Sequence, residues 1–202
     1  MINLPLKPHK WFEELPDSID SLYNRSFNKA VSSIVEKNLN ELLVTNFTLW
    51  GFEDEARRKD VPDQEIANLK RNIDRENQKR HNLIDKIDEL LREDIKDKSK
   101  GSNDTLPLNT ETPASILDRL IILALRKYHL KKETERKDTD VSHTKRCILM
   151  LKETEERSAD LLISLEELLI AYYSGKKRLK SYKEHKLYND PSLNPALRKQ
   201  SS

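Results

Sequence analysis

Apolar residues recur every three or four positions through most of this chain, which is the spacing of helices with one buried face. One stripe runs from Ile19 to Val35 after a possible cap at Asp17 or Ser18. A second runs from Leu39 to Ala56, and a third extends from about Asp63 to Ile95 after the break "KDVPD". The last two stripes predict a helical hairpin.

A second hairpin is predicted in the other half of the chain. Its first helix, "ASILDRLIILALRKYHL", is apolar on most sides, so we expect it to be central. The charged turn "KKETERKDTD" leads into a partner helix from about Val141 to Tyr173, with Gly175 as a helix stop.

The remaining segments are richer in proline and polar residues. Three prolines in residues 1–16 predict an irregular arm, which Trp11 and Phe12 could pin to the body. We therefore predict an all-α fold, a single helical-bundle domain over residues 1–202. Its parts are an arm (1–16), an N-terminal helix and first hairpin (17–96), a linker (97–113), a second hairpin (114–174), and a short basic helix with a tail (175–202).

Composition excludes several classes of protein. Of the 202 residues, 36% are charged, but the net charge is only +2, so no whole-chain attraction to nucleic acid is expected. The single cysteine rules out an intramolecular disulfide, and no window resembles a signal peptide or a membrane span. These features predict a cytoplasmic protein.

The longest hydrophobic seam is interrupted in "NIDRENQKRHNLIDKIDELL", residues 72–91. Asn77 and Arg80 occupy positions where the period requires apolar side chains. A 78-residue shift aligns "NLIDKIDELL" with "DLLISLEELL" and places these two residues on Glu155 and Ser158. The chain is therefore predicted to contain an internal repeat, with both long helices polar at matching mid-points.

Two interpretations of this interruption remain open. Either the helix curves and the head of Arg80 reaches water, or Arg80 is buried against a carboxylate, for which Glu155 is the candidate. Facing helices could add a stripe of Asn46, Trp50, Glu53 and Arg57, together with Asp118 and Arg119 opposite Thr154 and Glu155. These groups could form one satisfied network or line a pocket for a polar ligand.

Four ordered segments resemble a known family. "TNFTLWGFEDEARRKD", "IDRENQKRHNLIDKID", "TETPASILDRLIILALRKYH" and "YKEHKLYNDPSLNP" are similar to successive blocks of the bacterial domain-of-unknown-function family 4254, over about residues 40–195. The resemblance brings no biochemical activity, but it implies a bacterial origin and an association with surface-glycan synthesis genes such as glycosyltransferases. The family's recurring polar positions correspond here to Asn46, Trp50, Glu53, Asp54, Arg57, Asn77, Arg80, Asp118, Arg119, Asn189 and Asp190. Gly51 departs from the family, which has a bulkier residue after the tryptophan.

Residues 175–186 and the tail that follows suggest surface contacts. Six basic residues in "GKKRLKSYKEHK" could meet phosphates, RNA or an anionic membrane face, although an ordinary solvated helix is the simpler explanation. The turns in "YNDPSLNP" predict a shaped docking tail that includes Tyr188, Asn189, Asp190 and Asn194.

No complete catalytic constellation is found in the sequence. The chain lacks the Glu-x-x-His pairs of di-iron bundles, and Glu153 with Glu156 gives only one of the two acidic pairs of helical pyrophosphohydrolases. His143 and Cys147 are too few to make a zinc site, and no phosphate loop or dinucleotide fingerprint occurs. We expect neither cofactor nor metal. These absences favour a protein that is not an enzyme, without deciding the matter.

Two functions are therefore considered. The first is an interaction or accessory protein of bacterial surface-glycan synthesis, either as a homodimer or with glycosyltransferases as partners. The second is an enzyme or binding protein for a polar phosphorylated small molecule, such as a sugar nucleotide, held between the hairpins.

Overall fold

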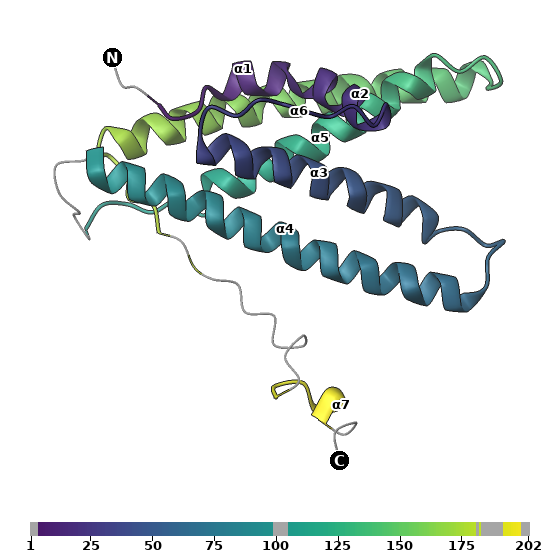
Figure 1. Cartoon of the computed structure of the whole chain (residues 1–202). Helices are drawn as coiled ribbons and strands as arrows, with labels where there is room; N and C mark the ends of the chain where they lie inside the picture. The colour runs from purple at the N-terminus through teal and green to yellow at the C-terminus, as the bar shows by residue number, and fades with distance from the viewer. Residues whose placement is uncertain (1–3, 99–104, 181, 183–191, 199–202) are drawn as a thin grey trace.

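The computed structural model describes residues 4–98, 105–180, 182 and 192–198, and all its regular elements in these ranges are helices (Figure 1). This confirms the all-α prediction. The helices are α1 (Pro8–Glu13), α2 (Leu15–Tyr23), α3 (Ile34–Glu55), α4 (Asp63–Lys98), α5 (Pro113–Thr134), α6 (Val141–Tyr173) and α7 (Pro195–Arg198).

Two antiparallel hairpins form the body of the molecule, as the hydrophobic pattern predicts. Helix α3 packs along α4, and α5 packs along α6. Three of the four helices start at a side-chain cap: Ser33 accepts from the Glu36 N–H, Thr112 and Ser115 form a reciprocal capping box, and Asp140 accepts from the His143 N–H. At the end of α6, Gly175 has a φ of +69°, which fits its predicted role as the stop.

The central position predicted for α5 is confirmed. It contacts α2, α3, α4 and α6, and its residues Leu117, Leu120 and Ile121 have no exposed surface. In Figure 1 the hairpins lie close together near one end and diverge toward their turns.

The 78-residue shift that aligns the sequence also aligns the helices. It places the first residue of α4 on the first residue of α6 and brings α3 within one residue of α5. The leucine-rich positions of both long helices are buried or half-buried. An internal repeat stays a prediction, since amphipathic helices of similar length match easily.

The N-terminal segment differs from the prediction. The arm contains α1, with Trp11 buried as expected, but the helix predicted from residue 17 to 35 ends at Tyr23. Arg25 has a left-handed φ of 54°, and residues 26–33 are not helical. The Ser33-x-x-Glu36 pattern was the overlooked signal, because it starts a new helix with a capping hydroxyl.

The predicted basic helix at residues 175–186 is wrong where the chain is described. Residues 174–180 and 182 are not helical. The N–H of Arg178 donates to Pro107 O at 3.2 Å, and Leu179 is buried. This segment therefore lies against the chain around Pro107. Tyr188, Asn189 and Asp190 lie outside the described residues, whereas Asn194 accepts from the Ala196 N–H at the start of α7.

No helix in the described part of the chain is both long enough and apolar enough to cross a membrane.

Two glycines should respond oppositely to alanine. Gly51 lies within α3, where an added Cβ would meet nothing within 4 Å, so Gly51→Ala should raise the free energy of unfolding by about 0.5–1 kcal/mol. Gly175→Ala should lower it by about 1 kcal/mol, because alanine is strained at a positive φ. Urea unfolding of both variants checks this, and a loss of stability in Gly51→Ala would contradict it.

Candidate functional site

The carboxylate of Asp118 lies where α3, α4 and α5 meet. Arg80 donates two hydrogen bonds to it, from Nε to Oδ1 at 2.9 Å and from Nη2 to Oδ2 at 2.8 Å. Asn46 donates a third from Nδ2 to Oδ1, also at 2.9 Å. Asp118 is almost fully buried, and the Arg80 side chain is 25% exposed. One carboxylate therefore joins the two helices of the first hairpin to the central helix of the second.

The two polar residues of the interrupted seam belong to this network. Arg80 Nη1 approaches Asn77 Oδ1 at 3.4 Å, so Asn77 flanks the guanidinium. Both earlier interpretations contribute: the guanidinium binds a buried carboxylate, and its outer edge still reaches solvent.

The expectation that Glu155 supplies this carboxylate is wrong. Glu155 is 49% exposed and pairs with Lys127 at 3.0 Å on the surface of the second hairpin. Ser158 and Thr154 are buried, but their hydroxyls donate to carbonyls of their own helix. The buried hydroxyls of α6 are therefore hydrogen-bonded within their own helix. Arg80 takes its carboxylate from α5 and not from α6.

A groove opens above Arg80 between the hairpins, and we call it the inter-hairpin groove. Its volume is about 290 Å³. Seven of the ten residues predicted for the polar cluster line it: Asn46, Trp50, Glu53, Asp54, Arg57, Asn77 and Arg80. Leu49, Ile122 and Leu125 form its apolar floor. The periodicity argument thus placed one side of this groove correctly.

Aromatic stacking fixes the tryptophan in the wall. Trp50 stacks on His129, with ring centroids 4.5 Å apart and planes 5° from parallel. The Tyr23 hydroxyl lies 2.8 Å from His129 Nε2, and burial lowers the pKa of this histidine despite nearby Asp54 and Glu133. A neutral imidazole is therefore the stacking partner at neutral pH. Sequence reasoning missed His129 and Tyr23, since neither interrupts a hydrophobic period.

The charges of the inter-hairpin groove nearly balance. Arg57 pairs with Glu53 at 2.8 Å, one turn apart on α3, and Arg80 pairs with Asp118. Asp54 adds one further carboxylate to the wall. Together with the buried Asp118 beside the groove, three carboxylates accompany two guanidinium groups, so the groove offers many hydrogen-bonding groups and no net positive charge.

A second groove, of about 440 Å³, lies on the other side of the Arg80–Asp118 pair. Its lining includes Arg119, which pairs with Glu111 rather than with the predicted network. Asp88 also lines it, almost completely buried, and accepts from the Ala114 N–H at 2.9 Å. Burial raises the pKa of Asp88 to about 6, although its hydrogen bonds from Thr112 and Ala114 oppose the rise.

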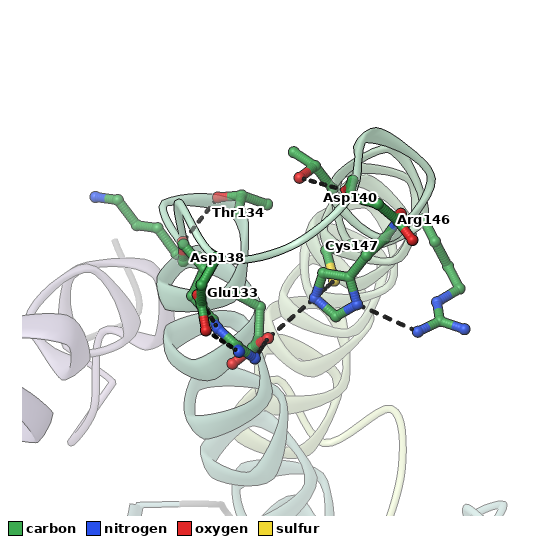
Figure 2. Close-up of polar contacts among 10 residues, drawn as sticks. Glu133, Thr134, Asp138, Asp140, Arg146 and Cys147 are labelled. Carbon is green, nitrogen blue, oxygen red and sulfur yellow. Dashed lines mark hydrogen bonds and ion pairs between the residues drawn. The ribbon is translucent and has the colours of Figure 1, made fainter.

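A separate polar cluster closes the turn between α5 and α6 (Figure 2). Arg136 clamps Glu133 and Asp138, and His143 Nε2 lies 3.0 Å from Glu133 Oε2 and 3.4 Å from Cys147 Sγ. Thiol and carboxylate approach the same ring nitrogen, whereas a catalytic triad needs them on opposite nitrogens. Among the described residues no group of three His, Cys, Asp or Glu could hold a metal ion. This cluster therefore stabilises a turn.

Comparison with protein families assigns the chain to one of them. A family model described as a protein of unknown function, DUF4254, matches residues 36–181. No curated protein and no solved structure matches the chain.

Removing the Asp118 carboxylate should destabilise the fold. Asp118→Ala leaves two charge-assisted bonds of Arg80 and one bond of Asn46 without an acceptor, so the free energy of unfolding should fall by about 2–3 kcal/mol. Arg119→Ala, at the next position of α5, breaks only the half-exposed pair with Glu111. It should change the free energy of unfolding by less than about 1 kcal/mol. Equal effects in urea unfolding would argue against a special role for Asp118.

Asp88 should make stability depend on pH. Its pKa is about 6 in the folded chain against 3.8 as the ordinary value, so the folded state favours the protonated acid. This contribution is complete below pH 4 and is lost as the pH rises through 6, amounting to at most about 3 kcal/mol. Asparagine does not ionise, so Asp88→Asn does not lose stability in this way. The free energy of unfolding of the variant, relative to that of the parent, should therefore increase from pH 4 to pH 7. A difference independent of pH in urea unfolding would contradict the raised pKa.

Proposed function

We propose, for a chain that belongs to the DUF4254 family, that the inter-hairpin groove binds the sugar part of a small polar ligand. By binding this ligand, the protein serves as an accessory protein in bacterial surface-glycan synthesis. The glycan setting comes from the family resemblance, and the ligand class comes from the groove.

The pre-oriented guanidinium of Arg80 carries the proposal. Asp118 holds it through two bonds, and Asn77 receives a third, long contact. A guanidinium has five N–H donors, so two remain without a partner among the described residues. Because the side chain is already ordered, a ligand that accepts from these donors loses little side-chain entropy on binding.

The other walls suit a hydroxyl-rich molecule. The amide of Asn77 can donate to and accept from hydroxyl groups, and the carboxylates of Glu53 and Asp54 can accept from them. Trp50, held by His129, offers a rigid apolar surface on which the C–H side of a sugar ring can pack. Polar groups placed around an apolar surface are what fixes the orientation of a ligand in a binding pocket.

Charge decides which part of a sugar nucleotide would enter. Two carboxylates, Glu53 and Asp54, and two guanidinium groups, Arg57 and Arg80, line the groove. Both guanidinium groups are paired, Arg57 with Glu53 and Arg80 with the buried Asp118. A diphosphate inside it would face excess negative charge. The sugar therefore occupies the groove, and any phosphate or nucleotide stays at its mouth. This favours binding over the phosphate chemistry that two unpaired arginines would have supported.

Ligand binding can be measured directly on the full chain. We expect isothermal titration calorimetry and thermal shift to detect at least one member of a panel of neutral monosaccharides, phosphosugars and nucleotide sugars. The free nucleotides and inorganic phosphate should give no signal, because the sugar supplies the contacts. Binding by phosphate alone, or no binding by any member of the panel, would overturn the proposal.

Two glutamates of α3 provide a matched control for the groove. Glu53→Gln changes a groove carboxylate and should weaken binding at least tenfold, as should Asn77→Ala. Glu55→Gln alters an exposed carboxylate outside the groove that pairs with Arg58, and it should bind like the parent. Equal loss in Glu53→Gln and Glu55→Gln would place the ligand elsewhere.

A further inference from the structure

Large apolar side chains lie exposed along the outer side of α6. Val141 is 70% exposed, Ile148 54%, Ile163 52% and Ile170 42%. They lie on one stripe, since seven residues separate Val141 from Ile148 and Ile163 from Ile170, close to two helical turns each. The core-facing side of α6, with Ser158, Leu165 and Tyr172, lies roughly opposite. We call the four residues the α6 stripe.

The spacing of the four residues in the α6 stripe is symmetric about its middle. A twofold axis between Glu155 and Glu156 would place Val141 of one copy against Ile170 of the other, and Ile148 against Ile163. Such symmetry is what an isologous contact between two copies of one helix requires. A partner of different sequence would not need it.

Charge around the α6 stripe selects the antiparallel direction. Its first part carries Lys145, Arg146 and Lys152, and its second part carries Glu153, Glu155, Glu156, Asp160, Glu166 and Glu167 with the single cation Arg157. An antiparallel pair brings basic parts against acidic parts, whereas a parallel pair opposes like charges. In the same register Lys145 faces Glu166 and Lys152 faces Ala159, while Glu155 and Glu156 of the two copies lie nearest the axis.

We propose that a second copy of this chain docks on the α6 stripe, antiparallel, about an axis between Glu155 and Glu156. The contact is independent of the inter-hairpin groove, which is formed by α3, α4 and α5. Glu166 also pairs with His9 of α1 at 3.3 Å, and its side chain keeps 47% exposure for a second contact. Docking covers four exposed apolar side chains in each copy and so removes them from water.

Sedimentation equilibrium of the full chain at tens of micromolar tests the association. The parent should have twice the 23.7 kDa of a single chain. Ile148→Glu with Ile163→Glu should give single chains, because four carboxylates would then meet at the contact. Met150→Glu changes an exposed apolar residue of the same helix away from the α6 stripe and should leave the dimer intact. A monomeric parent, or a dimer that survives the double substitution, overturns the proposal.

Disulfide trapping tests the register and does not depend on how the glutamate variant folds. Cys147 is the only cysteine, so Cys147→Ser provides a cysteine-free background. Adding Ile148→Cys and Ile163→Cys together should yield a covalent dimer on oxidation. Either cysteine alone should not, since its symmetry mate would lie roughly 20 Å away along the helix. Equal trapping of single and double variants, or no trapping of the double variant, excludes this register.

Discussion

The buried carboxylate of Asp118 constrains how the two hairpins meet. A charge placed among the apolar side chains of α5 would cost several kcal/mol if left without partners. Its three donors come from α3 and α4, so they can reach it only when the first hairpin crosses α5 at one position. The leucines and isoleucines around it would tolerate a slide of one turn far better. Hydrophobic burial therefore supplies most of the stabilisation, and this polar contact selects the alignment.

The same contact explains why a groove lies beside it. A guanidinium that binds a carboxylate with one edge keeps its other edge away from that carboxylate, so the position of Arg80 leaves N–H groups directed outward. The hairpins diverge from this point, and residues of α3, including Trp50 and Glu53, are left facing the opening. A structural lock alone would need only Asp118, Arg80 and Asn46. The stacked tryptophan and the acidic groups of α3 have no part in the lock, which is why we propose that they serve a ligand.

The sequence predicted features that depend on local periodicity and missed those that depend on how helices cross. The hairpins, the central α5 and the stop at Gly175 follow from spacing and backbone preference. Six groove residues also followed, because a polar stripe along α3 and the gap in α4 share a face, whereas Asp54 came only with the family resemblance. The choice of Glu155 failed because it assumed that the long helices of the two hairpins face each other at mid-length, whereas α5 lies there. His129 gave no signal, since a histidine at the edge of an apolar helix is ordinary in sequence.

The two long helices carry residues of different polarity at positions that the 78-residue shift makes equivalent. At the 78-residue shift, Val141, Ile148, Ile163 and Ile170 of α6 correspond to Asp63, Lys70, Asp85 and Arg92 of α4. The helices begin at equivalent residues and each packs mainly along its hairpin partner, so the geometry of a hairpin does not demand apolar residues at these positions. In α4 the equivalent positions are all charged, with Asp63 and Lys70 exposed and Asp85 and Arg92 half-buried. The apolar residues of α6 therefore need a cause outside the hairpin, and contact with another protein surface supplies one.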